Sequence, residues 1–289
     1  MIIDFAKRAL TLLAVTAVVF VSGAGADDIK IPDMGSPADA ILNKSQEAQI
    51  GRAIMRSIRQ SGQLVEDPQI TEYINDIGHR IAAQTNDGDH DFTFFVVNDP
   101  RINAFALPGG YIGVHTGLID ASRSEDELAG VIAHEIAHVT QRHIARSVHA
   151  SSRQSILSTA LMLGALILGA ASGDADAAQA GMAVAQGTAA QQQINFTRSN
   201  EHEADRIGIG ALAAAGFDPH GMSSFFEVMS RQQLSAPDER MPEFLRTHPV
   251  TTTRIAEART RAAEYPRVRS DDSVSYGITR ARLRVASFD

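Results

Sequence analysis

A five-residue motif in the middle of the chain restricts the fold more than any other feature of the sequence. His134-Glu135-Ile136-Ala137-His138 matches the pattern H-E-x-x-H. An α-helix turns about 100° per residue, so the two histidines lie about 40° apart on one face, with Glu135 at the edge of the same arc. Two imidazoles and a third protein ligand can hold one Zn²⁺ per chain, and Glu135 can then take a proton from a water molecule.

The residues around the motif favour a helix. Ser124 is a predicted N-cap, and Glu127 is its predicted partner in a capping box. Apolar residues continue at helical spacing from Leu128 to Val139, which predicts a half-buried helix with the histidines on its inner side. The alternative is an ordinary amphipathic helix with two buried histidines, but it leaves the position of Glu135 unexplained.

The third ligand must come from another part of the chain. A metzincin would need Gly at position 141 and His at position 144, whereas this chain has Gln141 and Ile144. If the helix continues, His143 falls about 180° from His134 around its axis, so we do not expect it to bind the metal.

A second acidic segment offers better candidates. In Glu201-His202-Glu203-Ala204-Asp205, the first and last carboxylates share a helix face with Leu212, whereas Glu203 points to the other side. A carboxylate on a buried face needs a partner, and a metal is one. We predict Glu201 as the third ligand and Asp205 as the hydrogen-bond acceptor for a ligand histidine. A solvated acidic stripe is the alternative.

Several motifs together resemble a known family. The chain carries the segments 103–112 and 116–118 before the zinc helix, then 199–205, then Arg246-Thr247-His248-Pro249. With H-E-x-x-H, they resemble the HtpX and CAAX-prenyl-protease family of zinc endopeptidases, most closely its periplasmic BepA-like branch. The likeness runs from about Ser45 to Glu264.

The resemblance implies roles for individual residues. His134, His138 and Glu201 would be zinc ligands, Glu135 the catalytic base, and His248 a residue that can approach the metal as an additional ligand. It also implies a periplasmic endopeptidase that acts on unfolded or misassembled envelope proteins, with the outer-membrane assembly machinery as a partner. The alternative is a non-hydrolytic chaperone or outer-membrane-protein assembly factor with a structural zinc. Members of the branch usually continue into tetratricopeptide repeats, which we do not expect within these 289 residues.

The amino terminus predicts export. Lys7 and Arg8 precede an apolar run from Ala9 to Val21, and small residues follow, so we expect residues 1–26 to be a cleaved secretory signal peptide. The run is shorter than the ~20 residues that span a membrane. The sequence has no cysteine, which excludes disulfides and a thiol nucleophile. A formal net charge of −8 argues against a nucleic-acid partner.

The segments before the zinc helix predict two helices and a small sheet. Residues 45–60 and 67–84 have helical periodicity, residues 92–97 are rich in β-formers, and 105–107 and 111–115 flank a Pro-Gly-Gly turn. We therefore predict an α+β fold, mainly helical and zincin-like. A free strand edge could bind an extended peptide, with Asn103, Ala104 and Phe105 as substrate-binding residues. The alternative is that these residues belong only to the core.

We expect one metallopeptidase domain over residues 27–264 and a C-terminal tail over 265–289. Segment 156–172 is almost entirely apolar. As a helix it would reach about 24 Å, which is shorter than the ~30 Å hydrocarbon core of a bilayer. It therefore predicts peripheral contact with a membrane surface, a lid over the active site, or a buried helix.

Overall fold

The computed structural model describes residues 37–85, 91–152, 195, 197–235, 241–268 and 271–286. The predicted signal peptide and the apolar segment 156–172 lie outside these residues. Within them, no helix combines the length and the apolar character that crossing a membrane requires.

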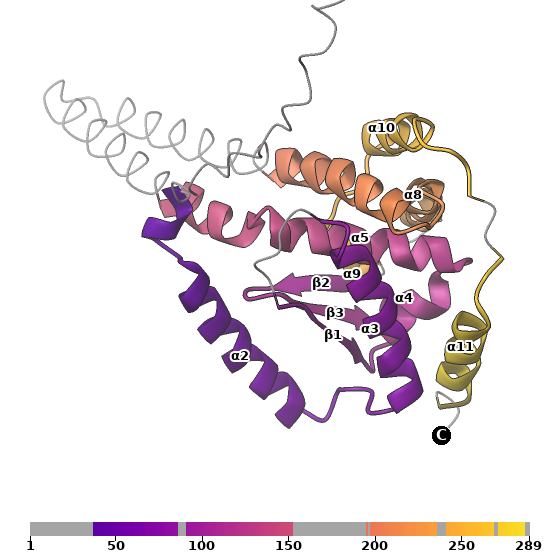
Figure 1. The fold of residues 1–289 in the computed structure, drawn as a ribbon, viewed down its shortest axis with the longest axis horizontal. Coiled ribbons are helices and arrows are strands. Elements are labelled where there is room, and N and C mark those ends of the chain that lie inside the picture. Colours follow the sequence, from indigo (N-terminus) through magenta and orange to yellow (C-terminus); the bar gives the residue numbers. More distant parts are fainter. Residues whose placement is uncertain are drawn as a thin grey trace, which may run out of the picture. The chain divides into compact units, whose positions relative to one another are not determined.

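The fold is mainly helical with one small sheet, as predicted (Figure 1). Two further stretches, 143–152 and 197–214, are also helical. The helices are a short 3₁₀ helix at Pro37–Ala40, α2 (Lys44–Gln60), α3 (Pro68–Ala82), α4 (Thr116–Ala121), α5 (Glu125–Thr140), α8 (His220–Ser235), α9 (Glu243–Thr247), α10 (Thr252–Ala262) and α11 (Val274–Ala286). The strands are β1 (Thr93–Val97), β2 (Ala104–Leu107) and β3 (Tyr111–His115).

Asp67 directly before Pro68 predicts a second N-cap, and both predicted helix starts are present. The Asp67 side chain accepts hydrogen bonds from the backbone at the start of α3, and the Ser124 hydroxyl accepts one from the Glu127 N–H. The capping box at Ser124 differs in one respect. The Glu127 carboxylate accepts from the backbone N–H of Arg123, one residue before the N-cap, at 2.8 Å. Both N-caps thus satisfy amide groups that have no partner within the helix.

The three strands pair in the order β1-β3-β2. Strands β2 and β3 form the predicted antiparallel hairpin, whereas β1 runs parallel to β3. In the turn of the hairpin, Gly109 and Gly110 have φ values of 81° and 86°, which residues with a Cβ rarely adopt. Because β3 lies between the other two strands, β2 is an edge of the sheet.

Both faces of the sheet are covered. Alternate residues such as Phe94 and Ile112 join the main core with α3 and α5, while Phe95, Val97 and Phe105 pack with Met55 of α2. This alternation follows from the period of two along a strand.

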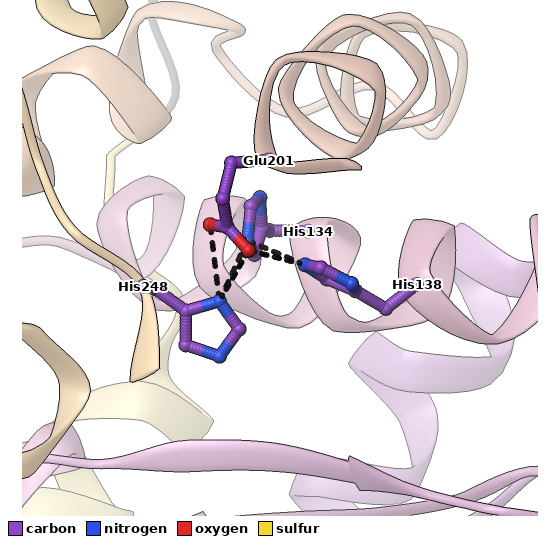
Figure 2. A group of neighbouring side chains, drawn as sticks. All are labelled: His134, His138, Glu201 and His248. Atoms are coloured by element: carbon purple, nitrogen blue, oxygen red, sulfur yellow. Dashed lines mark hydrogen bonds and ion pairs between the residues drawn. The ribbon is translucent and has the colours of Figure 1, made fainter. Parts of the chain in front are cut away.

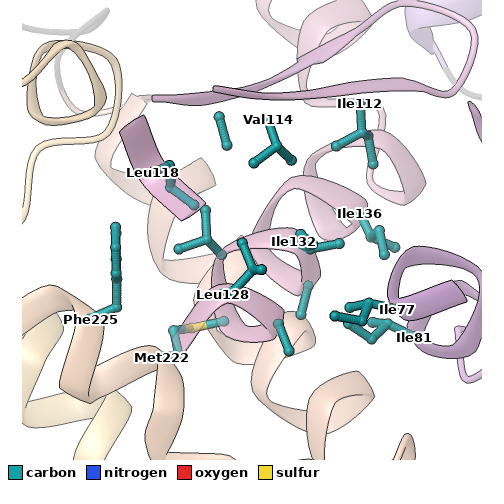
Figure 3. Packing of buried hydrophobic residues seen from close by; sticks show 14 of the residues in the cluster. Ile77, Ile81, Ile112, Val114, Leu118, Leu128, Ile132, Ile136, Met222 and Phe225 are labelled. Atoms are coloured by element: carbon teal, nitrogen blue, oxygen red, sulfur yellow. The ribbon is translucent and has the colours of Figure 1, made fainter. Parts of the chain in front are cut away.

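Helix α5 lies at the centre of the main core. Twelve of its sixteen residues are buried, so the prediction of a half-buried helix was wrong. Its Ile132 and Ile136 lie among side chains of α3, β3 and α8 (Figure 3). The backbone of Met222 in α8 would meet a Cβ at Gly130 at 2.8 Å. Glycine at position 130 thus allows the close approach of α8 that completes the enclosure of α5.

Residues 265–289, which we predicted to be a tail, contain helix α11. Its Tyr276 and Leu283 belong to the main core, and the Tyr276 hydroxyl donates a hydrogen bond to the Ser122 carbonyl at 2.8 Å. Three apolar side chains of α11, those of Val274, Ile278 and Val285, are exposed, while the buried positions include the polar Thr279, so the helix shows no clear apolar periodicity in the sequence. The folded unit therefore extends past Glu264.

Candidate metal centre

Four buried side chains from three parts of the chain meet beside α5. His134 and His138 come from α5, Glu201 from the helix 197–214, and His248 from the segment after α9 (Figure 2). One nitrogen or oxygen of each lies within 4.8 Å of the others. The predicted ligands His134, His138 and Glu201 are thus brought together, and His248 joins them.

The spacing of these atoms suits a tetrahedral metal ion. The Nε2 atoms of His134 and His138 are 3.0 Å apart, and each lies 3.3 Å from a Glu201 carboxylate oxygen. His248 Nδ1 lies 3.3 Å from His134 Nε2 and 3.1 Å from Glu201 Oε2. Zinc bonds of about 2.0–2.1 Å in tetrahedral geometry place ligand atoms about 3.3 Å apart.

The protons on the rings lead to the same conclusion. A neutral imidazole has one N–H and one lone pair, so three ring nitrogens converging on a point cannot all satisfy one another by hydrogen bonds. A cation at their centre accepts all the lone pairs and offsets the charge of Glu201. The donor set of three nitrogens and one carboxylate fits Zn²⁺.

The helix 197–214 packs closely on α5, which positions its carboxylates. A Cβ at Gly208 would meet backbone atoms of Ala133 at 3.1 Å. Asp205 lies on the face that points toward α5, and its Oδ1 is 2.9 Å from His134 Nδ1. This is the contact that the shared helix face of Glu201 and Asp205 predicted.

Sequence reasoning missed Arg254 of α10. Its guanidinium binds both carboxylate oxygens of Asp205, at 2.7 and 2.8 Å, and its Nη1 lies 2.9 Å from Glu201 Oε2. Nη1 also donates to the Pro249 carbonyl at 2.9 Å. One feature of the sequence indicates its role. Arg254 lies on the same helix face as Ala258 and Ala262, and an arginine on a buried face needs a carboxylate as its partner.

The setting of His248 differs from the prediction. Because proline is common at the first position of a helix, Pro249 predicts that His248 begins a helix running to about Glu264. In the structure His248 caps the end of α9 instead, and α10 starts only at Thr252 after the N-cap Thr251. The Thr251 hydroxyl accepts a hydrogen bond from the Arg254 N–H at 3.2 Å, so Thr251 and not His248 is the N-cap of α10. The imidazole is buried and stacks on the ring of Phe244, with centroids 5.0 Å apart.

His143 and Glu203 also lie close to the centre. The chain leaves the helical path after Thr140, so His143 does not face away from the motif as the projection predicted. Its Nδ1 lies 2.8 Å from His138 Nδ1, on the side of that ring opposite the metal position. Glu203 points away from the four donors, as predicted, and contacts His143 and Arg146.

Burial and neighbouring charges set the protonation of the donors. Burial lowers the pKa of His138 to about 3, which leaves its ring neutral. Burial also opposes protonation of His134, but the carboxylates of Asp205 and Glu201 outweigh it and raise its pKa to about 9 in the metal-free protein, so binding of a metal there would release a proton. For Glu201, the neighbouring histidines outweigh burial and hold the pKa well below its usual value. An ionised carboxylate is the form that binds a metal.

Glu135 lies next to the donors without being one of them. Its side chain is 1% exposed, and its Oε1 has no hydrogen-bond partner within the described part of the chain. His248 Nε2 is the nearby basic group, at 3.5 Å from this oxygen. A buried carboxylate with a free oxygen can accept a proton from a molecule that enters the site.

Strand β2 presents a backbone edge beside α5. The His115 N–H donates to the Asn103 carbonyl, so the alternation of antiparallel pairing turns the backbone groups of Ala104 and Ala106 outward. The Phe105 ring lies between those of Phe95 and His115, on the face away from α5. Of the residues 103–105, Ala104 is therefore the one whose backbone faces a possible peptide.

Comparison with known proteins gives a family match and several relatives. The model of Peptidase family M48 matches residues 68–262. The putative beta-barrel assembly-enhancing protease of Vibrio cholerae is 43% identical over 99% of this chain and 58% of its own length. The beta-barrel assembly-enhancing protease of Escherichia coli K12 is 41% identical over 94% of this chain and 55% of its own length. The mitochondrial metalloendopeptidase OMA1 of Arabidopsis thaliana is 28% identical over 75% of this chain and 41% of its own length. The chain thus spans little more than half the length of the bacterial relatives.

Proposed function

Since this chain belongs to peptidase family M48, we propose that it is a zinc-dependent endopeptidase. His134, His138 and Glu201 would hold the ion, and Glu135 would act as the general base. The observation that carries the proposal is the buried cluster of four metal-binding atoms with the free carboxylate oxygen of Glu135 beside it.

The chemistry divides between the ion and the protein. A bound zinc supplies Lewis acidity and lowers the pKa of water toward about 7. Glu135 accepts the proton of the attacking water and afterwards donates it to the amine that leaves. Asp205 holds the ring of His134 through Nδ1, so Nε2 would have its lone pair available for a metal.

The sheet edge supports an extended polypeptide as substrate. The outward backbone groups of Ala104 and Ala106 can pair with a peptide in β-conformation, which would then run along β2 beside α5. Such pairing uses backbone hydrogen bonds and does not depend on the side chains of the substrate. It requires an extended segment with free backbone groups, so it favours unfolded chains over folded ones. The substrate class is therefore unfolded or misassembled protein.

The bacterial relatives suggest where the substrates are found. Both carry the name beta-barrel assembly-enhancing protease, and the amino terminus predicts export. We infer that this protein acts in the periplasm on misassembled envelope proteins, in the context of the outer-membrane assembly machinery. Cleavage of an unfolded outer-membrane protein, but not of the same protein folded in micelles, is the expected result.

A specific observation favours a second reading, a chaperone or assembly factor with a structural zinc. A closed structural site has four protein ligands, and His248 supplies a fourth donor. The Glu135 oxygen that has no hydrogen-bond partner within the described residues favours the enzyme, because a structural site has no use for a buried carboxylate that is not a ligand. Both observations are reconciled if His248 occupies the fourth position at rest and leaves it when a substrate binds.

The test is cleavage of casein by the purified protein with and without chelator. Glu135→Gln should abolish hydrolysis and keep about one zinc per chain, because the amide keeps the shape and cannot accept a proton. Glu72→Gln, the same change at an exposed position of α3, is the matched control and should leave cleavage unchanged. Chelator-sensitive cleavage by Glu135→Gln would reject its role as base. Intact casein with the unmodified protein would favour the chaperone.

A further inference from the structure

The end of α5 brings a third histidine against the metal centre. The helix stops at Thr140, and Arg142 adopts a left-handed conformation with φ of 52°. The Arg142 guanidinium is held by Asp39, by Glu47 at 2.9 Å and by the Leu42 carbonyl at 2.8 Å. These contacts stabilise a backbone conformation that costs free energy in a residue other than glycine.

This turn folds His143 back under His138. The two rings are nearly perpendicular, with centroids 4.7 Å apart and Nδ1 atoms 2.8 Å apart. On the other side of the His143 ring, Nε2 lies 3.2 Å from Glu203 Oε2. Arg146 Nη1 lies 2.7 Å from the same oxygen. A continuous line of contacts therefore runs from the metal position to an ion pair at the rim.

The position of each proton in this line follows from the first ligand. If His138 binds metal through Nε2, its single proton is on Nδ1 and must be donated to an acceptor. His143 Nδ1 is within reach, so it is the acceptor and the proton of His143 lies on Nε2. That N–H donates to the Glu203 carboxylate, which also accepts from Arg146. Every donor in the line thus meets one acceptor.

The two α5 histidines are supported in parallel ways. His134 contacts the Asp205 carboxylate directly, and Arg254 binds that carboxylate from behind. Glu203 points away from the donors and cannot reach His138, so His143 bridges the gap, and Arg146 takes the place of Arg254. Each histidine of α5 is thus linked to a carboxylate that is paired with an arginine, directly for His134 and through His143 for His138.

We propose that His143 is a positioning residue for the metal ligand His138, and that Glu203 with Arg146 orients His143. The inference rests on the proposed function, because it requires His138 to bind the ion through Nε2. Loss of the acceptor on His143 leaves the His138 N–H buried without a partner and its ring free to rotate, which weakens metal binding.

The experiment compares zinc affinities by competition with a chromogenic chelator. His143→Leu removes the acceptor, whereas His143→Asn keeps an oxygen near the place of Nδ1. We expect His143→Leu to weaken zinc binding by about 10–100-fold. His143→Asn should restore most of that loss. The Co²⁺-loaded His143→Leu protein should also show shifted visible absorption bands, which a defect in packing alone would not produce. His79→Leu, at an exposed histidine of α3, is the matched control.

Glu203→Gln is a second variant that tests the line without altering the core around His143. It keeps the shape of the side chain and removes its charge, so it should weaken zinc binding by a smaller factor than His143→Leu. The proposal is overturned if His143→Leu and Glu203→Gln both bind zinc as tightly as the unmodified protein, or if His143→Asn is as weak as His143→Leu. A chain that binds no zinc at all would instead contradict the proposed function.

Discussion

Arg254 offers the sharpest test of the electrostatics at this centre. Its side chain is 2% exposed, and its three nitrogens contact two carboxylates and a carbonyl. Arg254→Met keeps the aliphatic stem and leaves the Asp205 carboxylate buried with only His134 as a counter-charge. Removing one member of a buried ion pair costs about 3–5 kcal/mol.

The expected effect is large enough for a thermal unfolding assay. In a domain of this size, 1 kcal/mol shifts Tm by about 2–4 °C, so the metal-free variant should melt about 10 °C below the unmodified protein. Zinc should raise the Tm of the variant more than that of the unmodified protein, because the ion offsets the charge of Glu201 in place of the guanidinium.

A control on the same helix separates burial from charge. Arg259 pairs with Glu227 at the surface and is 58% exposed, so Arg259→Met should change stability by less than about 1 kcal/mol. Equal shifts for the two variants, or a shift below about 2 °C for Arg254→Met, would refute the claim that Arg254 balances the buried carboxylates.

Two further predictions concern the ligands. Glu201→Ala should lose stoichiometric zinc and all hydrolysis, whereas Glu203→Ala should still bind one ion at saturating zinc, because Glu203 points away from the four donors. The zinc content of both variants tests this prediction. The reverse pattern would show that Glu203 is the ligand. His248→Ala should bind zinc through the remaining three ligands and cleave casein faster than the unmodified protein, because the fourth position is then open to water. Slower cleavage with unchanged zinc content would show that His248 assists the reaction.

The sequence by itself determined the features that depend on local spacing. The separation of four residues places His134 and His138 on one helix face, and the same periodicity places Glu201 and Asp205 together. Ser124 and Asp67 mark helix starts because a side chain satisfies amide groups a few residues away. These relations involve neighbours along the chain, so they can be read without knowledge of the fold.

Only the tertiary structure decided which side chains complete the centre. His143 reaches His138 because the chain turns at Arg142, and that turn is held by residues of the amino-terminal segment about a hundred positions earlier. Arg254 meets Asp205 because α10 packs where no local pattern could place it. Helix α5 is buried on nearly all sides for the same reason, since its cover comes from separate segments. Contacts of this kind depend on how distant elements pack, and the spacing of residues along the chain does not encode that packing.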